Sequence, residues 1–535
     1  MEDLKLIRPG EVRVRIAPSP TGPVHIGLAR TALFNYLFAQ KYQGTLILRI
    51  DDTDFQRSQK EWEENIIESL KWLNLEFQEG PDVGGKFGPY RQSERKFIYQ
   101  RYIQQLFDKE KIYHCFCTIE ELEAYRNYLL SIGQPPRYSG KCARLSKEEV
   151  EENLKKNKPY VLRFRTPFKR VRFRDLVRGE IEYDSENFGD IVIAKKIDSP
   201  LFNLASIIDD FEMKITHIIR GEDHISNTSI QILLIEALEI RKPQYLHLPL
   251  ILGINRAKLS KRDNVKSILE YRNEGYLPTA LINFLALLGW NPGTEKEIFS
   301  LSALIQEFSI DRIQKSGAIF NPQKLDWLNG VYIRQKSLKE LTEECLPYLI
   351  KAGLIEYYSE KEEIIDSSTN TFDDIKIDFN RLFISGLKIK ETQQEIGFQK
   401  LMQIISLYRE RLKKFSEISE LSDFFFKKEL DYESELLRWK EMTDKEIRIV
   451  LKKLIKVLNK ISEQNWNQRE LEEILLKLAG ELGEADKGYF LWPLRIALTG
   501  KKASAGPFEI AEVLGKEETL KRLQKAREII LKNDR

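Results

Sequence analysis

The stretch that decides the fold occupies positions 18 to 28 and reads Pro18-Ser19-Pro20-Thr21-Gly22-Pro23-Val24-His25-Ile26-Gly27-Leu28. Alternating apolar residues at 12–16 predict a strand before it, and its prolines and glycines predict a loop. A helical repeat of apolar residues starts at Ile26, and a second buried strand is expected at 45–50, directly before Asp51. Strand, loop, helix and strand form a βαβ unit, and open α/β sheets bind ligands at the carboxyl ends of their strands.

This loop places His25 and Gly27 at the start of a helix, where free N–H groups and the helix dipole favour phosphates. A histidine in that position can donate to a phosphate oxygen and stabilise the charge that develops on it. Gly27 leaves room for a flat base or a ribose against the backbone. The alternative for an isolated His-x-Gly is a proline-rich capping turn, but the complete string favours nucleotide binding.

A second motif lies much later in the chain and reads Lys258-Leu259-Ser260-Lys261-Arg262. Lysines on a mobile loop can hold the polyphosphate of ATP and steady a leaving pyrophosphate. The alternative is a solvated basic turn, because short Lys-rich strings are common on surfaces. The segment 80–86 has the glycine spacing of a P-loop, but Phe87 replaces the Ser or Thr that binds Mg²⁺, so we reject it.

Together the two motifs resemble the HIGH and KMSKS signatures of the class I aminoacyl-tRNA synthetases. The Pro-Ser-Pro-Thr-Gly lead-in resembles the glutamyl branch, in which Leu28 at the fourth signature position is usual. The resemblance implies an α/β Rossmann-like catalytic domain that is split by an insertion and followed by an all-α anticodon-binding region. It also implies that His25 and Lys261 are catalytic and that ATP contacts Pro18, His25, Gly27, Lys258, Ser260 and Lys261.

The activity that the resemblance implies is that of a glutamate–tRNA ligase using Mg²⁺ with ATP. Such an enzyme converts L-glutamate to glutamyl-adenylate and transfers it to the 3′ end of tRNA(Glu); charging of tRNA(Gln) stays open. One alternative is a tRNA-modifying glutamyl transferase, which lacks the part of this chain beyond Ile333. Another is a catalytically inactive tRNA-binding paralogue, against which the intact His25 and Lys261 argue. We expect a monomer with no membrane partner.

The same resemblance assigns the glutamate pocket, where arginines suit carboxylates because their planar fork binds bidentately. The positions that match the family's pocket are Arg15, Ala17, Ser19, Asp51, Phe202, Ser206, Arg220 and His224. Three of them depart from the usual pattern. Asp51 replaces a glutamate, Phe202 stands where a tyrosine hydroxyl is usual, and Ser206 occupies a variable position. For each arginine alone the alternative is a structural salt bridge.

Three of the four cysteines lie close together in the sequence, at Cys115, Cys117 and Cys142. Three thiolates with one further ligand suit a tetrahedral zinc ion. Some glutamyl enzymes resemble this arrangement and take the fourth ligand from a tyrosine four positions before the last cysteine, here Tyr138. His114 is a competing candidate, and reduced thiols without metal are the alternative. A zinc ion here is expected to brace the inserted domain.

A basic segment from Lys155 to Arg178 holds ten Lys or Arg residues and a single acid, Asp175. From Arg163 to Arg174 the arginines alternate with apolar residues, which in a strand places the charges on one face. We expect this face to contact the phosphate backbone of the tRNA acceptor end. The alternative is a solvated charged face.

Length and composition bound these predictions. The chain has 535 residues and a net charge of +3, which suggests three or four domains and excludes a histone-like polycation. Four cysteines exclude a secreted disulfide scaffold, and neither a signal peptide nor an apolar run of about 18 residues is found, so we expect a cytoplasmic protein. Sheet-like runs are predicted at 207–208 and 215–219. The expected domains are the catalytic halves 10–112 and 201–262, the insertion 113–200, a connecting region 263–335 and a helical region 336–535.

Overall fold

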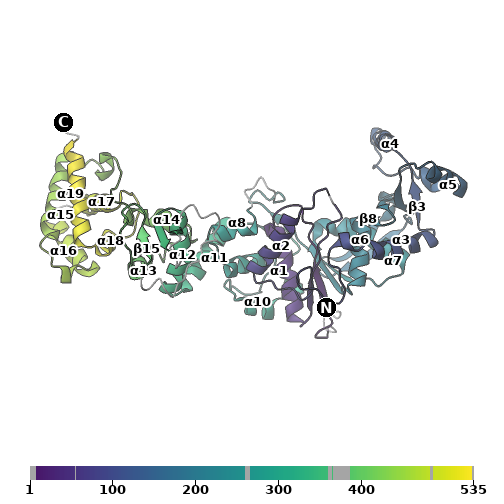
Figure 1. Cartoon of the computed structure of the whole chain (residues 1–535), viewed down its shortest axis with the longest axis horizontal. Coiled ribbons are helices and arrows are strands. Elements are labelled where there is room, and N and C mark those ends of the chain that lie inside the picture. Colours follow the sequence, from purple (N-terminus) through teal and green to yellow (C-terminus); the bar gives the residue numbers. More distant parts are fainter. Residues whose placement is uncertain are drawn as a thin grey trace. The chain divides into compact units, whose positions relative to one another are not determined.

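The computed structural model describes residues 8–54, 56–259, 266–358, 364–365, 386–481 and 486–532. They form two compact units, one made of Met1–Arg272 with Pro278–Leu328 and the other of Asn273–Leu277 with Asn329–Arg535. Figure 1 labels the helices and strands of both units. Three expected residues of the second motif, Ser260, Lys261 and Arg262, lie outside the described residues.

The first unit begins with the predicted βαβ arrangement. Strand β1 (Arg13–Ile16) pairs in parallel with β2 (Thr45–Leu48), and helix α1 (Ile26–Lys41) connects them. The helix buries its repeat of Ala29, Leu33 and Leu37, which explains why the chain turns back onto the sheet here. The expected strand, loop, helix and strand are therefore confirmed, and the second strand ends at Leu48, three residues before Asp51.

Further strands extend this sheet on the side of β1. The backbone N–H of Thr216 donates to the carbonyl of Arg13 and sets β9 (His217–Gly221) beside β1. Strand β10 (Gln244–Leu248) runs parallel to β9, and β5 (Arg170–Asp175) runs parallel to β10. Strand β6 (Gly179–Asp184) closes the row in antiparallel pairing with β5. The result is the mostly parallel sheet expected of a Rossmann-like fold.

Helices cover this sheet and build its core. They are α2 (Lys60–Trp72), α3 (Lys96–Asp108), α6 (Phe202–Glu212) and α7 (Ile225–Leu238). One apolar cluster joins α3, α6 and α7 to β5, β9 and β10. The sheet-like run predicted at 207–208 is wrong, because those residues lie inside α6, and their burial on a helix produces the same short apolar run as a strand.

The insertion has a sheet of its own, in the order β3 (Ile112–Cys115), β4 (Val161–Phe164), β7 (Val192–Lys196) and β8 (Ser199–Pro200), with antiparallel pairing throughout. Helices α4 (Ile119–Ser131) and α5 (Lys147–Lys155) each start with a capping box, from Thr118 and Ser146. Between β4 and β7 the hairpin β5–β6 leaves this sheet and joins the mostly parallel sheet described above (the main sheet), where Asp175 pairs with Tyr245. The stretch 113–200 thus contributes to two sheets.

The rest of the first unit follows the second motif. Short strands β11 (Ile251–Leu252) and β12 (Ala318–Ile319) pair in parallel, and helices α8 (Ile268–Asn273), α9 (Pro278–Leu287) and α10 (Leu301–Glu307) lie between them in the sequence. Helix α9 is buried over most of its surface, as its nearly continuous apolar sequence predicts.

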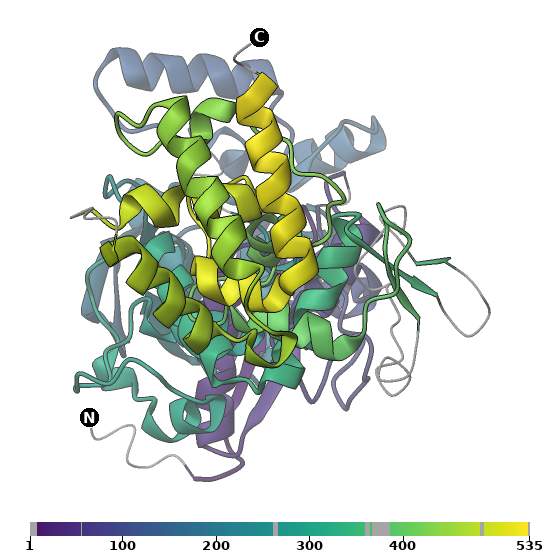
Figure 2. The same ribbon diagram turned by 90° about the vertical axis from the view of Figure 1, so that its left-hand side faces the viewer.

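The second unit is mainly helical, as expected. Its helices are α11 (Pro322–Gln335, shared with the first unit), α12 (Leu338–Lys351), α13 (Phe398–Ser406), α14 (Glu417–Ser422), α15 (Asp444–Leu458), α16 (Gln468–Glu481), α17 (Gly488–Thr499), α18 (Pro507–Leu514) and α19 (Lys516–Lys532). Figure 2 shows the yellow and green helices α15, α17 and α19 packed into a bundle.

The second unit also contains a small sheet, which the all-α expectation did not include. Strand β13 (Ile355–Tyr358) pairs antiparallel with β14 (Ile364–Ile365) and with β15 (Leu387–Ile389). Residues 359–363 and 366–385 lie outside the described residues. Every helix in the described part of the chain is too short or too polar to cross a bilayer.

Candidate active site

His25 is the N-cap residue of α1 and caps the helix with its own ring. Its Nδ1 accepts hydrogen bonds from the backbone N–H groups of Gly27 and Leu28, at 3.1 and 3.3 Å. Since Nδ1 accepts, the ring proton of the neutral tautomer lies on Nε2, which is then a donor. A Cβ on Gly27 would lie 3.0 Å from the His25 ring, so the glycine also makes room for this cap. The helix start therefore holds an exposed histidine oriented to donate.

The segment after the second motif lies close to this helix start. Ser267 forms a backbone bridge with His25, and Lys258 forms one with Leu252 of β11. The Lys258 ammonium lies 3.3 Å from a carboxylate oxygen of Asp223, in an exposed pair. Such a pair contributes little to stability, so Lys258 can exchange Asp223 for another anion at small cost.

Buried charges gather behind the loop at the ends of β1, β2 and α6. Arg15 donates to both carboxylate oxygens of Asp210, at 3.0 and 3.4 Å. Arg49 donates to both oxygens of Asp51, at 2.6 and 3.1 Å, and at 2.7 Å to Asp210 as well. Burial raises the pKa of Asp51 to about 6, against the opposing effect of Arg49. Asp51 is thus already paired with Arg49, and Asp210 is the carboxylate that Arg15 and Arg49 share.

The same network continues to a third arginine. Arg95 donates to Asp209 at 2.6 Å, and Gln92 and Tyr99 donate to the other oxygen of that carboxylate. Burial alone would raise the pKa of Asp210, but Arg15 and Arg49 outweigh it and hold that pKa below its usual range. Three cations and three carboxylates are therefore buried together, and each has an opposite partner.

Arg220, at the end of β9, differs from these arginines. Its hydrogen-bond partners among the described residues are the neutral side chains of Thr228 at 2.6 Å, Gln231 at 2.7 Å and His247 at 3.3 Å. Burial and the nearby Arg15 lower the pKa of Arg220 to about 10. A buried cation without a carboxylate in direct contact is costly unless an anion joins it.

Three further residues of the predicted pocket are Ser206, Phe202 and His224. Ser206 is buried, with its hydroxyl 3.5 Å from an Arg49 nitrogen. The Phe202 ring packs against His224 with a centroid distance of 5.6 Å, and Nδ1 of His224 is buried without a partner among the described residues. Burial, with Arg220 and Arg15 nearby, lowers the pKa of His224 to about 4, so its ring is neutral.

Ala17 and Ser19 lie in the loop after β1. The backbone N–H of Asp51 donates to the carbonyl of Pro18 at 2.9 Å, which ties this loop to the end of β2. Ala17 is half-buried and Ser19 is exposed, so both edges of the loop remain accessible. The loop therefore joins the predicted nucleotide residues to the predicted glutamate residues.

Sequence reasoning missed Arg49, Asp209 and Asp210, which complete the buried network. A signal was present, because Asp209-Asp210 follows an apolar run in which two adjacent acids are conspicuous. A strand, as predicted for that run, would place the two carboxylates on opposite faces. On helix α6 both point into the same charged cluster.

The predicted metal ligands come together in the insertion. The sulfurs of Cys115, Cys117 and Cys142 lie within 4.8 Å of one another. Cys117 Sγ lies 3.6 Å from Cys142 Sγ, and Tyr138 Oη lies 3.4 Å from both Cys115 Sγ and Cys117 Sγ. Zinc–sulfur bonds of about 2.3 Å at the tetrahedral angle place two sulfurs about 3.8 Å apart, so these spacings fit a tetrahedral donor set.

The basic segment agrees with the prediction only in part. On β5 the arginines at 170, 172 and 174 are exposed while Val171, Phe173 and Asp175 are buried, so the alternation is confirmed there. Arg170 and Arg172 both pair with Glu182 across the hairpin. Arg163 is not on this face: it is buried, and its guanidinium lies 3.9 Å from the ring centroid of Tyr138. It belongs to the thiol cluster.

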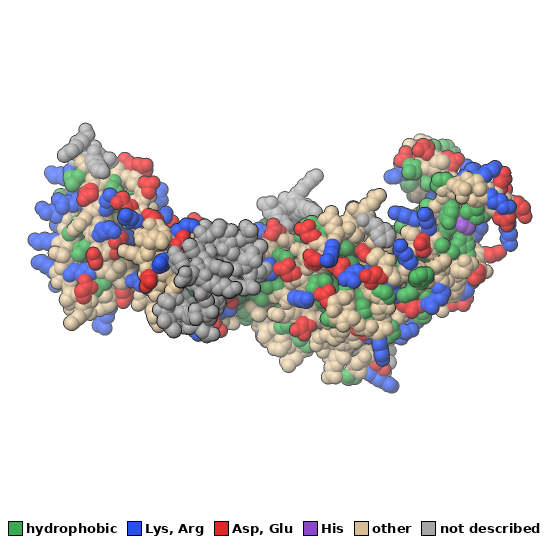
Figure 3. Space-filling model, in the orientation of Figure 1, with side chains coloured by type: hydrophobic (Ala, Val, Ile, Leu, Met, Phe, Trp, Pro, Cys, Tyr) green, Lys and Arg blue, Asp and Glu red, His purple; other side chains and the backbone are tan. Residues whose placement is uncertain are grey.

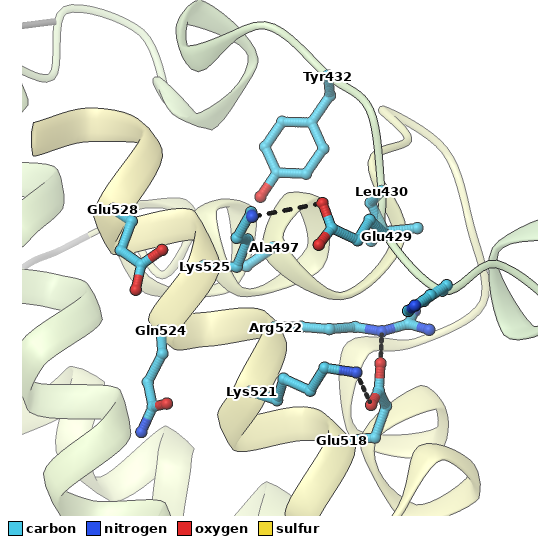
Figure 4. Close-up of a pocket in the computed structure, with 11 residues that line it drawn as sticks. Glu429, Leu430, Tyr432, Ala497, Glu518, Lys521, Arg522, Gln524, Lys525 and Glu528 are labelled. Atoms are coloured by element: carbon cyan, nitrogen blue, oxygen red, sulfur yellow. Dashed lines mark hydrogen bonds and ion pairs between the residues drawn. The ribbon is translucent and has the colours of Figure 1, made fainter. Parts of the chain in front are cut away.

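The second unit contains a cavity of about 160 Å³ between helix α19 and the segment 428–432 (Figure 4). Its cations have partners, since Lys525 lies 3.3 Å from Glu429 and Arg522 donates to Glu518 at 2.9 Å. In the view of Figure 3, many Lys and Arg side chains lie on the surface of the helices that end the chain. Lys525 and Arg522 are thus paired with carboxylates of the same cavity.

Comparisons with known proteins match both units. Residues 11–327 match the family described as class I tRNA synthetases (E and Q), catalytic domain, and residues 340–527 match an anticodon binding domain. A glutamate–tRNA ligase of Carboxydothermus hydrogenoformans is 43% identical over 96% of this chain and 99% of its own length. Glutamate–tRNA ligase 1 of Caldicellulosiruptor saccharolyticus is 44% identical over 96% and 98%.

A solved structure is similar over the same length. It is that of a glutamate tRNA ligase from Elizabethkingia meningosepticum in complex with its amino acid. The TM-score is 0.78 at 32% sequence identity, and the similarity covers 97% of this chain and 99% of the other. The similarity to known proteins therefore includes both units and is not confined to the main sheet of the first unit.

Proposed function

Since the chain belongs to the class I tRNA synthetases of the glutamate and glutamine type, we propose that it is a glutamate–tRNA ligase. Its substrates are L-glutamate, ATP with Mg²⁺, and tRNA(Glu). The cysteines, too few for a secreted scaffold, favour a cytoplasmic enzyme. We infer that it acts as a monomer.

The environment of Arg220 is the main evidence that the substrate is glutamate. Arg220 is buried, its side-chain partners are neutral, and the cationic Arg15 lies near enough to lower its pKa. A carboxylate placed beside it would neutralise a charge that the described protein residues do not pair directly. The buried Nδ1 of His224 offers one further polar contact to the same ligand. An amino acid with an uncharged side chain would leave this cost in place, because its only carboxylate is the one that reacts with ATP.

The nucleotide is assigned to the start of α1. In the first step, an α-carboxylate oxygen of glutamate attacks the α-phosphorus of ATP in line, and pyrophosphate leaves. His25 is suited to stabilise the phosphate charge, because Nδ1 accepts from the helix N–H groups, which places the ring proton of the neutral tautomer on Nε2, a possible donor to a phosphate oxygen. Lys258 and Lys261 are proposed to hold the polyphosphate. The mechanism needs no protein nucleophile.

In the second step, a hydroxyl of the terminal tRNA ribose attacks the carbonyl carbon of glutamyl-adenylate, and AMP leaves. The exposed arginines of β5 are proposed to contact the acceptor end, and the helical second unit is proposed to read the anticodon. A tRNA-modifying glutamyl transferase would not need this second unit. Charging of tRNA(Gln) is left to experiment.

Zinc is proposed for the cluster of Cys115, Cys117, Cys142 and Tyr138, whose spacings fit a tetrahedron. When bound, the ion supplies a structural crosslink and no chemistry of the reaction. Burial and the surrounding thiols raise the pKa of Tyr138, so its hydroxyl stays protonated unless a cation lies beside it. Arg163 over the Tyr138 ring favours negative charge on this cluster.

Aminoacylation of purified tRNA(Glu) and tRNA(Gln) with labelled glutamate tests the proposal directly. Arg220→Gln should lower kcat/KM for glutamate on the order of a hundredfold, because a desolvated charge pair with the substrate is lost. The matched control is Arg13→Gln on β1, whose guanidinium pairs with Glu79 outside the pocket. Tight tRNA binding without any aminoacylation by the wild-type enzyme would favour the inactive paralogue instead.

A further inference from the structure

A buried chain of polar groups runs from the β5–β6 hairpin to Arg220. Asp175 Oδ2 accepts from Nδ1 of His247 at 2.7 Å and from the backbone N–H of His247 at 3.0 Å. On the other edge of the ring, Nε2 of His247 lies 3.3 Å from Nε of Arg220 and 2.9 Å from Oγ1 of Thr228. His247 is fully buried, and Asp175 is nearly so.

The partners of Asp175 fix which nitrogen of His247 carries the proton. The other carboxylate oxygen of Asp175 accepts from the backbone N–H groups of Val177 and Arg178, at 2.9 and 2.7 Å. Because both oxygens of Asp175 accept from backbone N–H groups, the carboxylate acts as an acceptor, and Nδ1 of His247 beside it donates to it. The Nε2 lone pair then faces Arg220, which donates through Nε.

These contacts determine the direction of the Arg220 guanidinium. Because the group is planar, fixing Nε against His247 and Nη2 against Thr228 and Gln231 also fixes Nη1. Nη1 donates to none of the residues that the structure describes. The Asp175 carboxylate contacts the His247 ring and not the Arg220 guanidinium. It therefore does not neutralise the positive charge of Arg220 by direct contact.

We propose that His247, oriented by Asp175, is a positioning residue that holds the Arg220 guanidinium ready for a carboxylate of the amino-acid substrate. The inference rests on the proposed glutamate site. It adds two residues to that site that contact no substrate. It also explains why an aspartate and a histidine are buried together between the β5–β6 hairpin and strand β10, where apolar side chains would pack at lower cost.

Two substitutions separate the two edges of the His247 ring. His247→Asn keeps a donor toward Asp175 but lacks an acceptor that reaches Arg220, whereas the longer His247→Gln can present its amide oxygen to Nε. The matched control is His217→Asn, a buried histidine on the neighbouring strand β9 that bonds Thr216 and packs on Phe38. The readouts are the KM values for glutamate and ATP in aminoacylation, together with tRNA affinity.

We expect His247→Asn to raise the KM for glutamate at least tenfold, with the KM for ATP and the tRNA Kd within twofold of wild type. His247→Gln should recover most of the loss, and His217→Asn should leave all three values within twofold. An unchanged glutamate KM in His247→Asn overturns the proposal. So does a parallel rise in both KM values, which indicates only a structural role. Absence of glutamate-dependent activity in the wild type would instead refute the proposed function.

A measurement on the unaltered enzyme avoids the risk that a variant fails to fold. The chain has five histidines, so ring-¹⁵N spectra of histidine-labelled protein contain few signals. The proposal predicts that His247 is neutral with its proton on Nδ1 at neutral pH, and His247→Asn identifies its signal by subtraction. A charged ring, or a proton on Nε2, would place a donor against Arg220 and overturn the proposal.

Discussion

Asp210 accepts hydrogen bonds from two buried arginines, and its replacement tests the buried charge network. Asp210→Asn keeps the shape of the side chain and one acceptor oxygen, but removes the negative charge shared by Arg15 and Arg49. The three cations behind the signature loop would then be balanced by two carboxylates.

The size of the effect follows from burial. The Arg15, Arg49 and Asp210 side chains are at most 5% exposed, so water cannot compensate the charge that is left. Breaking a buried ion pair by removing one partner costs about 3–5 kcal/mol. Because asparagine still accepts one N–H group, we expect a loss of about 3 kcal/mol. At about 2 °C per kcal/mol for a large unit, the melting midpoint falls by on the order of 6 °C.

Urea titration of the full chain, followed by hydrogen–deuterium exchange and mass spectrometry, measures this loss locally. Peptides covering β1 and α6 report the first unit, and peptides covering α15 and α19 report the second as an internal reference. The control is Asp82→Asn, which removes an exposed ion pair with Lys71 and should cost less than about 0.5 kcal/mol.

The reasoning fails if Asp210→Asn destabilises β1 and α6 by no more than Asp82→Asn does. Equal protection in the two variants would mean that Arg15 and Arg49 find other partners or solvent. A loss of protection confined to α15 and α19 would also contradict it, because the charges that Asp210 neutralises lie in the first unit.

Other predictions concern the metal cluster, the pocket and the remaining thiol. Tyr138→Phe should weaken zinc binding at least tenfold in competition with a chelator, whereas Tyr113→Phe nearby should not; equal affinities would remove Tyr138 from the ligand set. Because burial raises the pKa of Asp51 to about 6, its carboxylate is protonated below that pH, and the KM for glutamate should rise from pH 7 to about 5.5; a flat profile contradicts a role for its charge. Cys345 is fully buried whereas Cys117 is partly exposed, so in metal-free protein Cys345 should react with a thiol reagent far more slowly than Cys117; similar rates would refute this.

The sequence predicted those parts of the site that have local signals. The loop from Pro18 to Gly27 combines turn residues with a following helical repeat, and such short-range patterns survive folding unchanged. The thiol cluster was also predictable, because Cys115 and Cys117 lie two positions apart at the end of one strand. The structure adds the close approach of Tyr138, which the sequence offered as one candidate among two.

Long-range partners could not be predicted in this way. Arg163 alternates correctly with its neighbours in a strand, but its burial is decided by Tyr138 on a distant loop. Arg49 pairs with Asp210 across 161 positions, and no periodicity encodes that contact. Asp175 looked like the single acid of a basic segment, yet its carboxylate is buried against His247. Which charged residues pair depends on the topology of the fold, and a single sequence does not show that topology.

The division of residues 113–200 between two sheets limits how this enzyme can be cut or recombined. Because β5 pairs in parallel with β10, the hairpin β5–β6 is structurally part of the main sheet, although it lies within the insertion. Deleting 113–200 as one block would expose an edge of β10 and remove the only acid bonded to His247 among the described residues. A graft that exchanges the inserted sheet must therefore use two separate segments, 112–164 and 192–200, and leave the hairpin between them in place.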